Sequence, residues 1–96
     1  MNYTTPSCLI QKEDISQLKF SNTEILVNSK KRKLRSHYLN RASQLGNLLK
    51  TKVKIHFIDH TNKLMIVNTT IWAVTSSFVI LKQGITIPKS SILYIE

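Results

Sequence analysis

Residues 63–95 read KLMIVNTTIWAVTSSFVILKQGITIPKSSILYI, and this segment predicts most of the architecture. Its β-branched and aromatic residues favour strands, and short polar breaks divide it into separate runs. The first run, Lys63 to Thr75, is long for one strand of a small sheet, so we expect it to bend. Phe78 to Lys82 predicts the next strand. Gln83-Gly84 then predicts a tight hairpin turn.

Two further short strands, Ile85 to Ile87 and Ser91 to Ile95, complete this segment. Pro88-Lys89-Ser90 separates them, because proline has no backbone donor for a sheet. Upstream, apolar and basic residues alternate over residues 50–57, which is typical of a half-buried strand with a basic outer face. Five short strands with close turns predict a small β-barrel.

A helix is predicted from Lys30 to Leu45, before the strands. Apolar residues recur there at spacings of four, four and three, which places them on one face. That face is expected to pack against the barrel, and its residues are Leu34, Tyr38, Ala42 and Leu45. Gly46-Asn47 is expected to end the helix, since glycine readily adopts the left-handed conformation of a C-cap.

The N-terminal part, residues 1–28, is expected to form a partly ordered arm in front of a single domain over residues 29–96. Ser21 to Glu24 has the form of a capping box, with a hydroxyl followed three residues later by a carboxylate. A helix could begin there, yet the β-branched run Ile25 to Val27 fits a short strand equally well. Residues 21–29 are therefore left open between helix and strand.

The chain is strongly basic, with 14 Lys and Arg against 5 Asp and Glu and a formal net charge of +9 over 96 residues. Such an excess repels itself and favours a polyanionic partner, of which phosphate backbones are the commonest. The single cysteine, Cys8, excludes an internal disulfide. No apolar run approaches the ~18 residues of a membrane span, and the first residues lack a secretory signal. We therefore expect a cytoplasmic protein without a membrane partner.

Basic residues of the predicted helix and first strand are the candidate phosphate contacts. The cluster from Lys30 to Arg35 lies at the positive end of the helix dipole, where each cation costs ~0.3–1 kcal/mol unless an anion binds. Lysines at alternate strand positions stand about 6–7 Å apart, close to the spacing of phosphates, although protection of a sheet edge explains them equally well. The candidate nucleic-acid-binding residues are Lys30, Lys31, Arg32, Lys33, Arg35, Arg41, Lys50, Lys52, Lys54 and Lys89.

Aromatic residues of the strands offer a second way to bind nucleic acid. Trp72, Phe78 and Tyr94 are able to stack on unpaired bases. In a core this small, however, most aromatic side chains are expected to fill space. Tyr38 is expected to pack against the barrel.

Catalytic and metal sites are not expected. His56, His60 and Asp59 provide too few ligands for zinc, and Asp59 is the only acid between Glu24 and Glu96, which excludes chemistry with paired carboxylates. The two glycines form no phosphate-binding loop or dinucleotide motif. We therefore expect a non-enzymatic protein without a cofactor.

The predicted order of elements, a helix, five strands and a one-turn break before the last strand, resembles that of the Sm and LSm family, which includes the bacterial Hfq proteins. The local match is best at Ser77 to Lys82, which is similar to the Hfq segment FVILLK, and at Pro88 to Ile92, where that family has YKHAI. The resemblance implies RNA binding by a ring of subunits. It also implies that Lys89 matches the lysine of a uridine pocket, with Pro88 and Ser90 in place of the aromatic residue and the histidine.

The predicted fold class is thus mainly β, a five-stranded Sm-like or SH3-like small barrel preceded by an N-terminal α-helix. The leading functional interpretation is a module that binds nucleic acid, RNA in preference to DNA. The alternative is a protein-interaction adaptor or inhibitor, whose SH3-like barrel docks on an acidic partner. The apolar strands Ile85 to Ile87 and Ser91 to Ile95 also suggest a homo-oligomer.

Overall fold

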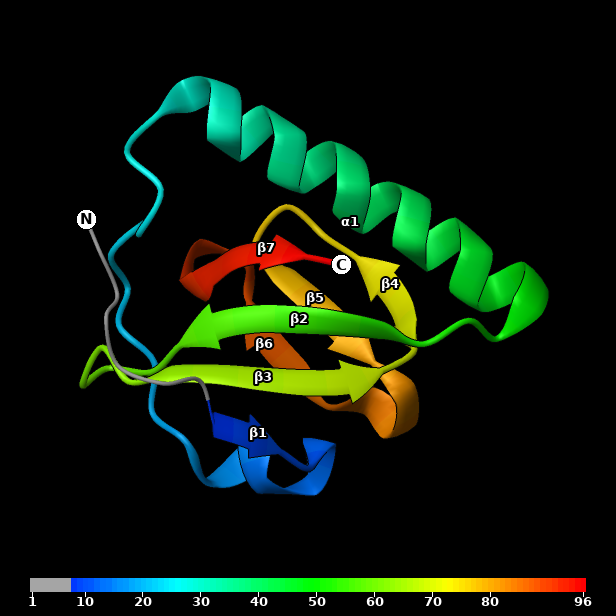
Figure 1. The fold of residues 1–96 in the computed structure, drawn as a ribbon, viewed down its shortest axis with the longest axis horizontal. Coiled ribbons are helices and arrows are strands. Elements are labelled where there is room, and N and C mark those ends of the chain that lie inside the picture. Colours follow the sequence, from blue (N-terminus) through cyan, green and yellow to red (C-terminus); the bar gives the residue numbers. More distant parts are fainter. Residues whose placement is uncertain (1–7) are drawn as a thin grey trace.

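The computed structural model describes residues 8–96, and within that range seven strands form two sheets beside one long helix (Figure 1). The first sheet has the strand order β1-β3-β2-β7, and the second has the order β4-β5-β6. The strands are β1 Cys8–Ile10, β2 Val53–Ile58, β3 Leu64–Thr69, β4 Ile71–Val74, β5 Phe78–Leu81, β6 Thr86–Pro88 and β7 Ile92–Ile95. The helix is α1 Ser29–Leu49, and the 3-10 turns are η1 Lys12–Gln17, η2 Lys82–Gly84 and η3 Lys89–Ser91.

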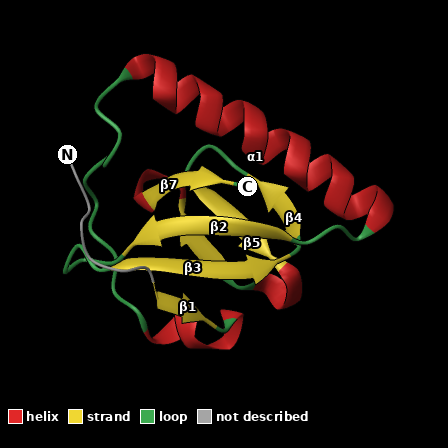
Figure 2. Cartoon of the chain, viewed as in Figure 1, coloured by secondary structure: helices red, strands yellow, loops and turns green. Residues whose placement is uncertain are grey.

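A mainly β fold is confirmed (Figure 2), and α1 precedes every strand except β1. The expectation of five strands in a closed barrel is wrong, because seven strands form two sheets. The long run of residues 63–75 does bend, and Thr70 divides it into β3 and β4. This corner carries the chain from one sheet to the other, since β3 pairs with β2 while β4 pairs with β5. A one-turn break before the last strand was also predicted correctly; it is the 3-10 turn η3, which begins after Pro88.

Aliphatic side chains from both sheets fill the core. Each fully buried leucine or isoleucine stabilises the fold by ~1.5–3 kcal/mol. Phe57 is the one aromatic residue in this buried set. Its other members include Ile15, Leu39, Ile55, Val67, Ile71, Val79, Leu81, Ile87 and Ile92. The contribution of Ile15, from η1, makes the segment before α1 part of the same core.

Helix α1 contacts β4 and β7, which are edge strands of different sheets, so it covers the seam between them (Figure 1). Its buried residues, at spacings of four, three and four, are Arg35, Leu39, Ala42 and Gly46. The expected packing face was therefore wrong except at Ala42. Leu34, Tyr38 and Leu45 lie on the flank of the helix and are exposed.

Gly46 does not end the helix, as predicted, but lies inside it. A Cβ atom at this position would lie 2.6 Å from the carbonyl oxygen of Ile71, far closer than a van der Waals contact. Glycine therefore allows α1 to approach β4 closely. The helix continues to Leu49, and Lys50 forms the left-handed C-cap with φ of 54°.

The sequence did not decide between helix and strand for residues 21–29. Residues 21–28 form neither of the two, and α1 begins at Ser29. Ser21 and Glu24 accept hydrogen bonds from the amides of Thr23 and Leu26, so they cap local turns of the chain and not a helix. The N-cap of α1 is Asn28. Residues 1–7 of the predicted arm lie outside the described residues.

Candidate nucleic-acid interface

The first turn of α1 carries the exposed lysines Lys30, Lys31 and Lys33. The side-chain oxygen of Asn28 accepts hydrogen bonds from the amides of Lys30 at 2.8 Å and Lys31 at 3.2 Å. These two amides are thus already occupied and are not free to bind a phosphate. A phosphate at this end of the helix would be bound by the lysine ammonium groups.

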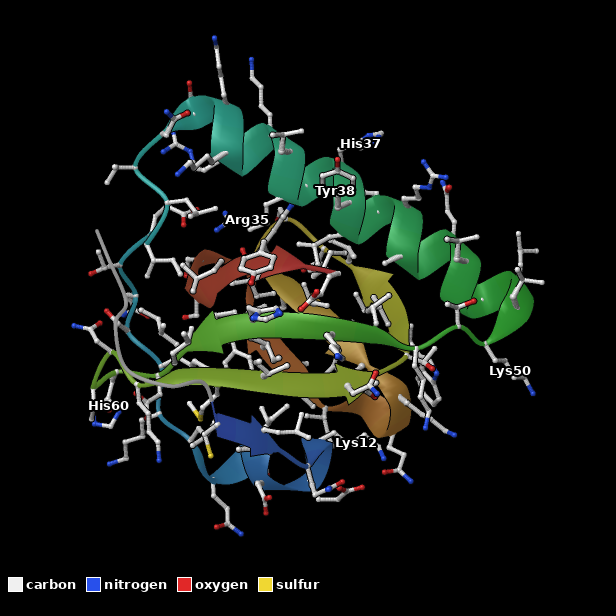
Figure 3. The ribbon with its side chains drawn as sticks, viewed as in Figure 1. Lys12, Arg35, His37, Tyr38, Lys50 and His60 are labelled. Atoms are coloured by element: carbon white, nitrogen blue, oxygen red, sulfur yellow. The ribbon has the colours of Figure 1, made fainter. Side chains whose placement is uncertain are left out.

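Arg32 and Arg35 belong to the same sequence cluster but are engaged within the protein. Nη1 of Arg32 donates to the carbonyl oxygens of Leu26 at 2.8 Å and Val27 at 2.9 Å. Arg35 is only 6% exposed and lies on the side of α1 that faces the sheets (Figure 3). Both guanidiniums form hydrogen bonds that hold α1 to other parts of the protein, so they are not part of the proposed interface.

An ion pair with Glu24 holds Arg35 in place. Nη1 of Arg35 donates to Oε2 of Glu24 at 2.8 Å and to the carbonyl oxygen of Ile92 at 3.0 Å, and Nη2 donates to Oε1 of Glu24. Burial raises the pKa of Glu24, but the hydrogen bonds from Arg35 and the Leu26 amide and the charge of Arg35 outweigh it. The pKa of this carboxyl is therefore lowered.

Lys89 is half-buried and begins η3, which is hydrogen-bonded to the segment that precedes α1. Its neighbour Ser90 accepts a hydrogen bond from the amide of Ile25 at 3.1 Å, and the amide of Lys89 donates to the carbonyl oxygen of Ser77 at 2.9 Å. Phe78, which follows Ser77, pairs with Pro88 across β5 and β6, and its side chain is 45% exposed. We call Lys30, Lys31, Lys33, Phe78 and Lys89 the N-terminal patch.

The other predicted contacts do not join this patch. Lys50 caps the far end of α1, about 30 Å from its start at 1.5 Å per residue. The expected strand over residues 50–57 starts only at Val53, so Lys54 is the one lysine of this predicted row that lies in β2. Lys52 precedes the strand, and Arg41 is exposed between the two ends of α1.

The expectation that most strand aromatics fill the core is wrong. Trp72, Phe78 and Tyr94 are each about half exposed, because every one of them points to the side of its strand away from the buried aliphatic residues. Tyr38 is 49% exposed and does not pack on the sheets as expected. His56, expected on the basic outer face of its strand, is buried, because the ring of Tyr94 covers it.

Few cations have an acidic partner. Among residues 8–96, only two of the 14 lysines and arginines form a salt bridge, Lys12 with Glu13 and Arg35 with Glu24. Glu96 pairs with His56 at 2.6 Å. The exposed positive charge is therefore largely uncompensated, and it favours an anionic partner.

Within residues 8–96, no three His, Cys, Asp or Glu side chains gather in a way that could hold a metal ion. No helix of the same range has the length and apolarity to cross a membrane. Comparison of the chain with family models, with curated proteins and with solved structures found no match.

Proposed function

We propose that this chain is a non-enzymatic cytoplasmic module that binds single-stranded nucleic acid, RNA in preference to DNA, through the N-terminal patch. One observation carries the proposal. Lys30, Lys31 and Lys33 at the start of α1 are exposed and have no carboxylate partner within residues 8–96. The segment before α1 is hydrogen-bonded to η3, which carries the half-buried Lys89 beside the half-exposed ring of Phe78. Proteins that bind single strands combine such lysines, which contact phosphates, with aromatic rings, on which bases stack.

The chemistry of the patch supports binding that tolerates many sequences. Lysine ammonium groups contact phosphates without reading the base, and the ring of Phe78 can stack on any base. Four lysine–phosphate contacts would give log Kd a slope of about 3 against log salt, since each contact to a single strand contributes ~0.7.

We further propose kinship with the Sm-like family and self-association. The helix before the strands, the bend at Thr70 and the turn η3 before β7 support this kinship. Strands β6 and β7 are both edge strands, and because α1 packs against β7, β6 is the edge whose outer backbone groups another copy could pair with. Native mass spectrometry of the purified particle would test the assembly, and a monomer at all concentrations would remove this part of the proposal.

A charge-matched pair of triple variants tests the binding surface. K30A/K31A/K33A removes three lysines from the start of α1, and K50A/K52A/K54A removes three from the stretch between the C-cap of α1 and the start of β2. Fluorescence anisotropy with a labelled single-stranded RNA should show that the first variant weakens binding at least tenfold and lowers the salt slope by about 2. The second should change binding much less. Equal losses in both variants, or a wild-type slope near zero, would contradict the proposal.

A second candidate function, docking on an acidic protein, is favoured by the exposed flank of α1. Leu34, Tyr38 and Leu45 lie there, beside a chain with a charge of +9. A second copy would bring the same charge, so an acidic segment of another protein suits this flank better. Co-purification with and without nuclease separates the two functions. RNA lost on nuclease treatment supports the first, and a stoichiometric acidic protein that is lost in a Tyr38→Asp variant supports the second.

A further inference from the structure

The outer face of the first sheet carries a row of large side chains that the proposed nucleic-acid interface does not use. Leu9 of β1 pairs with Ile66 of β3. On the next strands, His56 of β2 lies opposite Ile66, and Tyr94 of β7 lies opposite His56. The row faces outward, because Ile55, the neighbour of His56 in β2, points into the core and side chains alternate along a strand. We call Leu9, Ile66, His56 and Tyr94 the sheet row.

The sheet row is accessible from solvent and runs across all four strands. Leu9 is 67% exposed at one end, and Tyr94 is 52% exposed at the other. Between them Ile66 is half-buried, and the ring of His56 stacks on that of Tyr94 with the ring centroids 4.1 Å apart. Three strand spacings of ~4.8 Å make the row about 14 Å long. These side chains therefore form a continuous strip and are not isolated on the surface.

The exposed flank of α1 lies on the β7 side of the helix, next to this row. Asn47 and Leu45 follow and precede the buried Gly46, so they point about 100° to opposite sides of it. Asn47 donates to the carbonyl oxygen of Trp72 in β4 at 3.2 Å, so its side of the helix faces the second sheet. The side of Leu45 and Tyr38 therefore faces β7, the other strand that α1 contacts. Figure 3 shows Tyr38 on the side of α1 toward the viewer, where the first sheet lies in front of the second.

Uncompensated cations border this surface. Arg41 is exposed and lies three residues after Tyr38, so it is on the same flank of α1. Lys54 is exposed and lies two residues before His56 in β2, so it is on the outer face of the sheet. Neither cation forms a salt bridge within residues 8–96. Glu96, the acid beside the row, is already paired with His56 at 2.6 Å.

The chemistry of the surface favours a protein partner that is acidic. Contiguous exposed apolar surface marks a site of protein contact, and the aliphatic members Leu9, Leu45 and Ile66 offer no ring on which a base could stack. A second copy of the chain would bring the same cations and the same charge of +9. An acidic segment would instead place carboxylates next to Arg41 and Lys54.

The length of the surface suits a helix of the partner. The sheet row is about 14 Å long, and α1 adds the ~10 Å width of a helix, which gives ~24 Å in all. A helix of about 16 residues spans this distance at 1.5 Å per residue. Apolar residues at every third or fourth position of such a helix form one stripe, which is the usual way for a helix to dock on an apolar surface.

We propose that the sheet row and the exposed flank of α1 form one docking surface for an acidic amphipathic helix of a partner protein. The apolar stripe of that helix lies on the row, and its carboxylates pair with Arg41 and Lys54. This inference rests on the second candidate function, and it extends the docking surface from α1 to the outer face of the first sheet. The N-terminal patch consists of other residues, so RNA and the partner helix bind to separate surfaces.

Selection from a display library of helical peptides of about 16 residues, with the full chain as bait, tests the surface. Enriched peptides should carry aliphatic residues at every third or fourth position, with Asp or Glu beside them. Anisotropy with one such peptide should show at least tenfold weaker binding to Tyr38→Ala and to Tyr94→Ala. Trp72→Ala removes an equally exposed aromatic residue from the second sheet and should leave the affinity unchanged.

A charge exchange separates direct pairing from a loss of folding. R41E/K54E should bind the acidic peptide at least tenfold more weakly, and replacing the acids of the peptide by lysine should restore binding to this variant. A misfolded protein would bind neither peptide. K30A/K31A/K33A should lose affinity for RNA and keep its affinity for the acidic peptide, so failure of the N-terminal patch is distinguishable from failure of the docking surface.

Each opposite result has a defined meaning. If Tyr38→Ala releases the peptide and Tyr94→Ala does not, the second candidate function stands and the extension to the sheet row is overturned. The proposal is also overturned if no acidic peptide is enriched, or if the lysine peptide binds the wild-type chain as tightly as the acidic one. A dimer in light scattering that Tyr94→Asp dissociates would assign the surface to a second copy, and a tenfold loss of RNA affinity in Tyr94→Ala would assign it to nucleic acid.

Discussion

Arg35 of α1 donates to both carboxylate oxygens of Glu24, eleven residues earlier in the chain, and to the carbonyl oxygen of Ile92 in β7. One guanidinium therefore joins the segment before α1, the helix and the first sheet. Arg35 belongs to the densest run of positive charge in the sequence, yet it stabilises the fold through a buried ion pair and does not contribute to the surface.

Removing the ion pair between Arg35 and Glu24 should lower the free energy of unfolding and change the affinity for nucleic acid little. Arg35→Ala leaves Glu24 without its partner, and breaking a buried pair from one side costs ~3–5 kcal/mol. We expect a value near 3 kcal/mol by urea unfolding, because Glu24 is partly exposed to water. A double variant, E24Q/R35M, should recover part of this loss. An Arg35→Ala protein of normal stability would show that the pair contributes little.

Stability should fall in acid because the carboxyls of Glu24 and Asp59, in addition to that of the exposed Glu13, have lowered pKa values in the folded protein. The ordinary values are 4.5 for Glu24 and 3.8 for Asp59. A lowered folded pKa gives stability that is present above the ordinary value and is lost as the pH falls toward the folded value. Urea unfolding between pH 7 and pH 3 should show a decline that begins near pH 5. Glu24→Gln should flatten this decline, and the exposed control Asp14→Asn should not.

Gly46→Ala should destabilise the fold although alanine is the better helix former. The added carbon would meet the carbonyl oxygen of Ile71 at 2.6 Å, and such overpacking costs ~1–3 kcal/mol, more than the ~1 kcal/mol gained in helix propensity. Asn40→Ala, on the exposed face of α1, is the matched control and should stabilise by a few tenths of a kcal/mol. Thermal unfolding would measure both, and a raised Tm for Gly46→Ala would contradict the close approach of helix and strand.

Phe78→Ala should weaken RNA binding without unfolding the protein. Stacking of a base on an aromatic ring is worth ~1–3 kcal/mol, so affinity should fall about tenfold, while the half-exposed ring contributes little to the core. Tyr94→Ala removes a comparable exposed ring from the outer face of the other sheet. Anisotropy should show a much smaller loss for Tyr94→Ala, and similar losses would mean that the bound strand does not favour the N-terminal patch.

The strand pattern could be predicted from the sequence because it depends on local chemistry. The hairpin at Gln83-Gly84 and the break at Pro88 follow from residues that adopt or exclude particular backbone conformations. The number of strands could not be predicted, since Cys8–Ile10 becomes a strand only by pairing with β3.

The buried face of α1 could not be predicted because two stripes of the helix share Ala42. The more apolar stripe, with Leu34 and Tyr38, looks like the better core, yet the stripe with Arg35 and Gly46 is buried. Tertiary contacts decide which stripe is buried. Glu24 and the carbonyl oxygen of Ile92 accept hydrogen bonds from the guanidinium of Arg35. The backbone of β4 comes so close to the helix that only a glycine fits at position 46. The candidate site was predicted only in part, since the hydrogen bond between Ile25 and Ser90, which joins the segment before α1 to η3 and Lys89, is a long-range contact that no local pattern reveals.

The position of α1 across the seam has a consequence for cooperativity. Neither sheet can separate from the other while the helix remains docked on edge strands of both, so partial opening at this place would require release of the whole helix. Amide hydrogens in the middle of α1, around Leu39 and Ala42, should therefore exchange with solvent only when the entire protein unfolds.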